Sequence, residues 1–380
     1  MIRKRISFDA LGVTAEVAAF GSEKGVAEWH VILHVAPCND DFEGQLRRIY
    51  AAEDTLPNLP EMEGAHYVLK RYFLSDSTNQ VPLMRQDDST ANISCIGQQP
   101  LDGSKLAVWL YLQRGTLISK ENGVTLCRHN DYTHLWHMGL TSPEGDSARQ
   151  TECILKQYEA ELAHFGITLA DNCIRTWFFV RDVDTQYAGM VKDRRENFVE
   201  QGLTENTHYI ASTGIGGLPA DTKALVQMGA YAVTGLEPQQ LRYLYAPSHL
   251  NPTYEYGVTF ERGTAIEYGD REHVYISGTA SINNKGKVVH ERDIRQQTLR
   301  MWENVETLLA EAGTTYDDVM HLIVYLRDMA DYALVCKMFE ERFPDIPTVI
   351  TLAPVCRPTW LIEMECIAVK KKENQHYRNF

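Results

Sequence analysis

The residues best suited to chemistry lie in the last strand of the chain and in the turn before it. Arg357 stands in a proline-flanked turn, Glu363 follows six residues later within an apolar run, and Glu365 comes two places further on. Because side chains of a strand alternate between its faces, both glutamates share one face with apolar side chains. A carboxylate on such a face is costly to bury unless it is paired. The spacing therefore predicts a fixed guanidinium beside a half-buried carboxyl group.

A pair of this kind has two interpretations. The arginine can hold a substrate carboxylate through two parallel hydrogen bonds while the glutamate moves a proton next to it. Alternatively, Arg357 and Glu363 form an ion pair that only stabilises a sheet. The closing segment by itself leaves both interpretations open.

Two longer segments of the chain resemble each other, residues 157–182 and 304–328. Each predicts an amphipathic helix that stops at a glycine, Gly166 or Gly313, since glycine readily adopts the left-handed conformation that follows a helix end. A polar turn and a strand of β-branched and aromatic residues follow, and both strands end in Arg-Asp. A second helix comes next in each copy.

The first hundred residues contain a fainter copy of the same order. Residues 42–56 predict a helix, residues 66–76 the following strand, and residues 91–96 and 105–112 a final pair of strands around a turn. The order strands, helix, strand, helix, strands therefore occurs three times.

We divide the chain accordingly into three repeats, residues 1–114, 115–250 and 251–380, with a linker at residues 246–253. The expected fold class is α+β, in which helices cover one face of each mixed sheet.

Composition argues against several classes of function. The 380 residues carry a formal net charge of -14, whereas nucleic-acid binding needs clustered Lys and Arg, so we expect no nucleic-acid partner. Asp9 interrupts the apolar stretch that a secretory signal would need, and no run approaches the length of a membrane span, so we expect no membrane association. The eight cysteines lack Cys-x-x-Cys spacing and are typical of reduced thiols in a cytoplasmic protein. Neither they nor the thirteen histidines have metal-ligand spacing, so we expect no metal and no cofactor.

The third repeat resembles the YjgF/RidA (Rid, endoribonuclease L-PSP-like) superfamily along nearly its whole length. The resemblance rests on Tyr275 to Ile282, the helix from Gln297 to Ala312, the strand from Val324 to Asp328, Arg357, and Ile362 to Val369. It implies the chorismate mutase-like fold of that superfamily, whose members are homotrimers with sites between subunits. Three such copies in one chain imply an intramolecular pseudo-trimer, so we expect a monomer, with higher association left open.

The same resemblance implies roles for particular residues. In the superfamily, the arginine of the closing segment binds a substrate carboxylate, a glutamate of the last strand handles water, and an aromatic residue near the start of the domain lines the pocket. Motif matching places these roles on Arg357, Glu363 and Phe260.

The other two repeats have different residues at the positions that match the arginine and the glutamate. These are Ser212 and Gln227 in the second repeat, and residues near Ile93 and Leu106 in the first. A purely structural pair would be as useful in all three sheets. We therefore expect one site of three to have kept its chemistry, where the third repeat meets a neighbouring repeat.

The whole chain is similar to a narrower group, the chorismatases, which are long Rid-like proteins that act on chorismate. The matching segments are spread along the chain: Ile174 to Val180, Tyr187 to Arg195, Ala211 to Gly216, Arg242 to Pro247, Phe260 to Gly263, Ile276 to Ile282 and Cys356 to Glu365. An arginine expected before Tyr243 is replaced by the run from Glu237 to Gln240. Gly263 and Cys356 stand where chorismatases differ among themselves, and they resemble the subgroup that makes 3-hydroxybenzoate.

Chorismate carries two carboxylates and a ring, so its pocket needs a second cation and polar groups for the ring. Arg262 is one candidate for that cation, with a surface salt bridge as the alternative. Arg175 is a weaker candidate, since its apolar strand favours a structural ion pair. Tyr243 and Tyr245 could offer hydroxyl groups, or they could serve only in amphipathic packing.

Two glycine-containing strand segments and one thiol complete the candidate site. Thr213 with Gly214, and Ser277 with Gly278 and Thr279, could present backbone N–H groups and a hydroxyl to the substrate, or could mark strand bends only. For Cys356 we favour pocket lining or a buried thiol over a nucleophile, because no histidine lies nearby in the sequence.

The leading functional hypothesis is a chorismate-converting enzyme that releases pyruvate. A protonated Glu363 would protonate the enolpyruvyl group while Arg357 holds a carboxylate, which requires a raised pKa from desolvation and from the like charge of Glu365. The alternative is a 2-imino acid or enamine deaminase, in which an ionised Glu363 steers water onto an iminium carbon. A third hypothesis is a non-catalytic sensor of small carboxylates, and a ribonuclease is disfavoured by the acidic charge balance.

Overall fold

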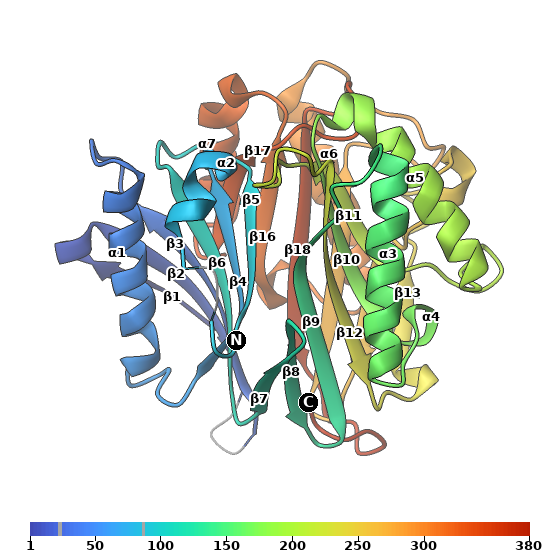
Figure 1. Cartoon of the computed structure of the whole chain (residues 1–380), viewed down its shortest axis with the longest axis horizontal. Helices are drawn as coiled ribbons and strands as arrows, with labels where there is room; N and C mark the ends of the chain where they lie inside the picture. Colours follow the sequence, from blue (N-terminus) through green and yellow to red (C-terminus); the bar gives the residue numbers. More distant parts are fainter. Residues whose placement is uncertain (22–24, 86–87) are drawn as a thin grey trace.

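The computed structural model of the chain describes residues 1–21, 25–85 and 88–380. These residues form three six-stranded mixed sheets that follow one another along the chain (Figure 1). Within each sheet one pair of strands is parallel and the other pairs are antiparallel. In spatial order the first sheet contains β1 (Ile2–Phe8), β2 (Val13–Phe20), β3 (Ala27–Val35), β6 (Leu106–Arg114), β4 (His66–Leu74) and β5 (Asn92–Gly97).

The other two sheets repeat this strand order. The second contains β7 (Leu117–Glu121), β8 (Val124–His129), β9 (Tyr132–Thr141), β12 (Val226–Thr234), β10 (Cys173–Val180) and β11 (Ala211–Gly216). The third contains β13 (Leu241–Leu244), β14 (Gly263–Glu267), β15 (Arg271–Ala280), β18 (Ile362–Lys371), β16 (Val319–Leu326) and β17 (Thr348–Leu352). The α+β class and the threefold repetition expected from the sequence are confirmed.

The helices α1, α3 and α6 each pack on the outer face of one sheet, and α5 packs beside α3; α1 and α3 lie on opposite sides of the molecule in Figure 1. The helices are α1 (Phe42–Thr55), α2 (Ser77–Gln80), α3 (Ser147–His164), α4 (Leu169–Asn172), α5 (Val183–Glu200), α6 (Ile294–Glu311) and α7 (Tyr332–Arg342). An aspartate side chain accepts a backbone N–H at the start of each of the three long outer helices. As predicted, Gly166 and Gly313 follow α3 and α6 with positive φ angles of 71° and 75°.

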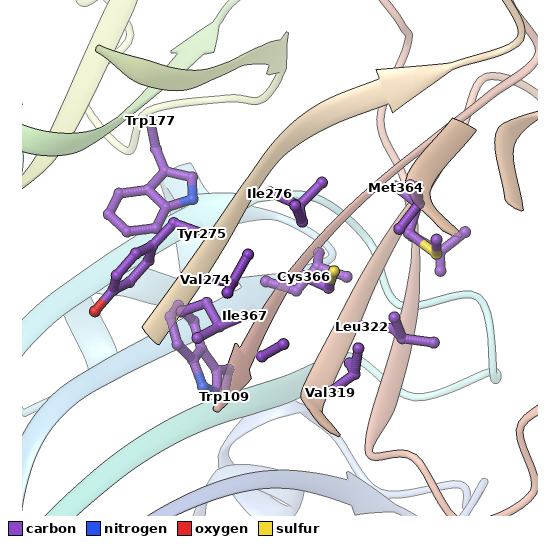
Figure 2. Close-up of a cluster of buried hydrophobic side chains, with 14 of the residues drawn as sticks. Trp109, Trp177, Val274, Tyr275, Ile276, Val319, Leu322, Met364, Cys366 and Ile367 are labelled. Atoms are coloured by element: carbon purple, nitrogen blue, oxygen red, sulfur yellow. The ribbon is translucent and has the colours of Figure 1, made fainter. Parts of the chain in front are cut away.

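The inner faces of the three sheets meet in the centre of the molecule. Trp109 of the first sheet, Trp177 of the second and Tyr275 of the third belong to one buried cluster, drawn in Figure 2. The central strands β10, β16 and β18 are therefore buried on both faces, except at the last two residues of β18. This explains why their sequences are mostly apolar, with few polar residues, on both faces. Among the described residues no helix is long and apolar enough to cross a membrane.

The boundary between the second and third repeats remains a prediction, but one strand near it can be placed. β13 pairs with β14 through Leu241–Ile266 and Leu244–Gly263, so it belongs to the third sheet although the division at 250 assigns it to the second repeat. The expected linker at residues 246–253 is packed rather than extended. Ala246 and Leu250 are buried, and the backbone N–H of Ala246 donates to Glu311.

Strand pairing defines the matching of positions among the repeats. Glu363 lies opposite Tyr325, Gln227 opposite Phe179, and Ala107 opposite Phe73, so the counterparts of Glu363 are Gln227, as expected, and Ala107, next to Leu106. The sequence locates such a position only approximately because the register of an apolar strand depends on its partner.

The counterparts of Arg357 are different from those expected. Ser212 and Ile93 lie within β11 and β5, whereas Arg357 lies in the loop after β17, the equivalent strand. They are therefore not counterparts of Arg357, because they lie within the strands that precede the corresponding loops.

Candidate active site

A cavity of about 280 Å³ lies between the second and third repeats. The second repeat contributes residues of α5 and β11, and the third contributes the ends of β15 and β18 with the loops that precede β14 and β18. The described lining residues are Tyr187, Ala188, Val191, Arg194, Ser212, Gly214, Gly257, Val258, Phe260, Arg262, Gly278, Ala280, Ile282, Cys356, Arg357, Trp360 and Glu363. Seven of the residues singled out from the sequence are thus brought together: Gly214, Phe260, Arg262, Gly278, Cys356, Arg357 and Glu363.

Glu363 is the one acidic residue among the described lining residues. Its side chain is almost fully buried, and no hydrogen bond to its carboxyl group is formed by the described part of the chain. Burial, aided by the negative charge of Glu365, raises the pKa of this carboxyl group to about 8, against the opposing effect of Arg175 and Arg262. At pH 7 such a group is about ten times more often protonated than ionised.

Glu365 has the opposite environment two residues further along β18. Its Oε2 accepts from Arg175 Nη2 at 2.8 Å and from the Thr213 hydroxyl, and its Oε1 accepts from Trp177 Nε1 at 2.9 Å. Arg71, from the first repeat, contributes a further bond at 3.4 Å. This buried carboxyl group is thus paired with two guanidinium groups, whereas the carboxyl group of Glu363 faces the cavity.

Thr213 and Gly278 connect this ion cluster to the cavity. The Thr213 hydroxyl accepts a hydrogen bond of 2.9 Å from the backbone N–H of Gly278, which lies at the register shift of β15. The Glu363 carboxylate packs directly over Gly278, where a Cβ atom would collide with it. Gly278 is therefore needed for a close approach of the carboxyl group to the strand.

Arg357 and Arg262 are the two lining arginines that the sequence indicated. Arg357 is partly exposed, donates to the carbonyl oxygen of Gly286 at 3.2 Å and lies 4.7 Å from the ring centre of Trp360. Arg262 is buried and donates to the carbonyl oxygen of Asn251 at 3.0 Å, so it does not form the surface salt bridge considered as an alternative.

A third arginine, Arg194, was not found by sequence reasoning. It lies on α5 of the second repeat, is 1% exposed, and donates to the Ser212 hydroxyl at 3.4 Å. An arginine on an amphipathic helix normally predicts a solvated face. Its one sequence signal is its place within the segment from Tyr187 to Arg195, one of those that resemble chorismatases.

The remaining lining residues missed from the sequence include Tyr187 and Trp360. The Trp360 ring donates from Nε1 to the carbonyl oxygen of Ser281 at 2.9 Å, which fixes it beside Arg357. The ring of Tyr187 lies against Gly214, where a Cβ atom would be 3.0 Å from it.

Several residues singled out from the sequence do not line the cavity. Tyr243 stacks on His208 with ring centres 4.6 Å apart, and Tyr245 is 46% exposed. Gly263 packs against Leu244 and β15 rather than facing the cavity. Arg175 and Thr213 lie behind it in the ion cluster, as the apolar strand around Arg175 indicated.

Ser277 and Thr279 are buried beside the cavity and serve the backbone. The Ser277 hydroxyl donates to the carbonyl oxygen of Glu261 at 2.6 Å and accepts from the backbone N–H of Ser212 at 2.8 Å. The Thr279 hydroxyl donates to the carbonyl oxygen of Ser277 at 2.9 Å. These bonds join β14, β15 and β11 across the interface between the two repeats.

Cys356 lines the cavity as a thiol. Burial, together with the nearby Glu363, raises the pKa of the Cys356 thiol to about 12. The group is therefore protonated at neutral pH and unsuited to act as a nucleophile. Within residues 1–21, 25–85 and 88–380, no three His, Cys, Asp or Glu side chains are grouped so as to hold a metal ion.

The fold defines a class of protein built from three repeated α+β units, with a cavity at the interface between two of them. The family model described as Endoribonuclease L-PSP matches residues 264–370. A RutC family protein of Pyrococcus abyssi is 33% identical over 109 residues, which are 28% of this chain and 84% of that protein. The chain therefore belongs to this family, the YjgF/RidA superfamily.

Two further similarities concern named activities. The 3-aminoacrylate deaminase RutC of Acinetobacter baylyi is 35% identical over 72 residues, 19% of this chain and 57% of that protein. Among solved structures, a chorismatase superposes with a TM-score of 0.64 and 20% identity, covering 81% of this chain and 95% of its own. The chain thus has a chorismatase-like fold built from three Rid-like repeats.

Proposed function

We propose that the chain is an enzyme that converts chorismate and releases pyruvate. The observation that carries the proposal is the cavity itself, which combines one protonated carboxyl group, Glu363, with three arginines. An ionised base would suit a substrate that must lose a proton, whereas this carboxyl group can donate one near neutral pH. The fold shared with a chorismatase gives further support.

The geometry suits an enolpyruvyl ether. Arg357, at the partly exposed edge of the cavity, would hold the enolpyruvyl carboxylate in a bidentate grip. Glu363 would transfer its proton to the methylene carbon, leaving an oxocarbenium-like carbon next to the ether oxygen. Addition of water to that carbon and breakage of its bond to the ether oxygen would release pyruvate and a dihydroxycyclohexadiene acid. Alternatively, the neighbouring ring hydroxyl would lose its proton and displace the ether oxygen from the ring, so that pyruvate leaves with that oxygen and the resulting epoxide rearranges to 3-hydroxybenzoate.

Chorismate has a second carboxylate on its ring, and the cavity offers cations for it. Arg262 and Arg194 are buried on opposite sides of the interface, one from each repeat. In a poorly solvated cavity, a charge-assisted hydrogen bond to a guanidinium is stronger than one to a neutral donor. We therefore assign the ring carboxylate to these two residues.

Deamination of a 2-imino acid or enamine is the second candidate. It is favoured by the similarity to a 3-aminoacrylate deaminase and by the fact that Arg357 could hold a single carboxylate equally well. This reaction would use Glu363 in its ionised form to direct water. A 2-imino acid or enamine has a single carboxylate, which Arg357 alone could bind. It offers no second carboxylate for Arg262 and Arg194, and we therefore prefer chorismate as the substrate.

The test is release of pyruvate from chorismate by the purified full-length protein, followed with a coupled lactate dehydrogenase assay. We expect turnover, and we expect Glu363→Gln to lower kcat by about 10²–10⁴-fold, the usual contribution of a general acid. Glu373→Gln, in the exposed C-terminal segment, is the matched control and should leave the rate unchanged.

Absence of pyruvate would refute the proposal. If the protein instead accelerated ammonia release from imines generated by an amino-acid oxidase, the deaminase candidate would take its place.

A further inference from the structure

The interface between the third and first repeats is built from the same parts as the candidate active site. There the third repeat contributes α7 and β17, the counterparts of α5 and β11. The first repeat contributes β2, the end of β3, and the loop before β6, where Asp102 lies. A cavity of about 520 Å³ occupies this interface.

The second cavity has lost the groups that make the first one a site for anions. The spacing from Tyr187 to Arg194 on α5 equals that from Tyr332 to Phe339 on α7, so an aromatic ring replaces the buried arginine. The counterpart of Glu363 is Ala107, as the strand register shows. Without counterparts of Arg194 and Glu363, this larger cavity is not suited to a dicarboxylate.

A histidine between two carboxylates forms the polar wall of the second cavity. His34 Nδ1 lies 3.1 Å from Asp102 Oδ2, and His34 Nε2 lies 3.8 Å from Glu16 Oε2. Burial opposes a charge on His34, but the two carboxylates outweigh it and raise the pKa of the imidazole to about 9. Arg5 adds a second bond to Glu16 at 2.5 Å. The two cations are thus already engaged by carboxylates.

A third carboxylate, Glu340, lies on the exposed side of α7 near the cavity. It approaches the Cys336 thiol at 3.5 Å, and the charges of Asp102 and Glu340 both act on Cys336 and on Tyr332. Both carboxylates therefore lie close to the same turn of α7. With Arg5, His34 and Glu16 included, the charged lining carries one net negative charge near neutral pH.

The rest of the lining is apolar and partly aromatic. It contains Val35, Pro37, Tyr332, Phe339, Phe343, Ile346, Val349 and Ile350. A ligand-binding cavity commonly combines such walls with a few polar groups that set the orientation of the ligand. Aromatic rings beside carboxylates are also the environment that attracts an organic cation.

We propose that this cavity is a second ligand site, which takes a small molecule with an apolar ring and a protonated amine. The ring packs against the side chains of α7 and β17, and the ammonium group lies between Asp102 and Glu340. The site is separate from the proposed active site, so the outcome of its test does not depend on chorismate turnover.

The test is isothermal titration of the full-length protein with 2-phenylethylamine, with phenylacetate as the anionic probe of similar shape. We expect a Kd of about 1 mM or tighter for the amine, and binding of the anion weaker by at least about tenfold. Ala36→Trp, at the exposed mouth of the cavity, should abolish binding of the amine. Ala188→Trp makes the same change at the other cavity and should leave it intact.

Glu340→Gln is a second variant, and we expect it to leave the stability of the fold unchanged because this side chain is exposed. It should weaken amine binding about threefold or more, and a thermal unfolding transition like that of the wild type would establish that each variant is folded. The proposal is overturned if the amine gives no heat up to about 10 mM, if phenylacetate binds equally well, or if neither Ala36→Trp nor Glu340→Gln changes the affinity.

Discussion

At the scale of single residues, the two glutamates of β18 illustrate how neighbouring side chains define the environment of a carboxyl group. Glu365 receives four hydrogen bonds from the first and second repeats, whereas Glu363 receives none from the described residues and faces a cavity. Their side chains share a strand face and a nearly equal degree of burial. The difference between them arises from their partners rather than from burial alone.

The raised pKa of Glu363 predicts the pH dependence of the proposed reaction. A general acid works in its protonated form, which is present below a pKa of about 8 and is lost as the pH rises through that value. We expect kcat/KM for chorismate to be level near pH 7 and to fall tenfold per pH unit well above pH 8. A deaminase that used the ionised carboxylate would show the reverse, a rate that rises through this range, so the pH profile distinguishes the two candidate functions.

At the scale of elements, the irregularity in β15 places its backbone beneath Glu363. The register with β18 shifts between Ile276 and Thr279, and Gly278 lies within that shift. A bulge of this kind redirects the strand and lets a neighbouring side chain approach the backbone. The position of the Glu363 carboxyl group therefore depends on the backbone of β15, a strand that contributes no reacting side chain.

We expect Gly278→Ala to impair the reaction without unfolding the protein. The added Cβ would collide with the Glu363 carboxyl group and displace it, and a displacement near 1 Å can cost about 10²-fold in rate. Gly313→Ala is the contrasting variant, because its positive φ of 75° strains any side chain although nothing lies within 4 Å. It should lower stability by roughly 1–2 kcal/mol and leave kcat unchanged. Equal effects of both variants on kcat and on the unfolding temperature would contradict this assignment.

At the scale of the whole molecule, one buried ion cluster joins all three repeats. Arg71 comes from the first, Arg175 from the second and Glu365 from the third, and each side chain is at most 4% exposed. The guanidinium of Arg71 also lies 4.7 Å from the ring centre of Trp177. Removal of one member of such a cluster leaves buried charge without compensation.

Glu365→Gln should therefore affect both stability and the active site. We expect a loss of about 3–5 kcal/mol in the free energy of unfolding, since two buried guanidinium groups lose their counterion. The pKa of Glu363 should also fall, because a like charge is removed, and the falling limb of the pH profile should move to lower pH. Glu341→Gln on the exposed face of α7 is the control for both measurements. A destabilised variant with an unchanged pH profile would show that Glu365 supports the fold only.

Much of the fold could be predicted because its signals are local. The helices that end at Gly166 and Gly313, and the apolar strands that follow them, are specified by residues within a few turns of each other. The register between paired strands was harder to predict from the sequence. The sequence placed the counterpart of Glu363 in the first repeat only near Leu106, since pairing with β4 rather than any local pattern decides that Ala107 lies opposite Phe73.

The sequence by itself determined the threefold repetition and the closing segment that holds Arg357 and Glu363. Only the tertiary structure decided which repeat faces that segment, since Arg194 and Tyr187 reach the cavity from a helix more than a hundred residues away in the chain. It also decided the partners of each glutamate, because Arg175 and Glu365 are 190 residues apart and meet only when the inner faces of the sheets pack together. Local spacing specifies helices and strands, whereas desolvation and ion pairing depend on which distant side chains share the interior.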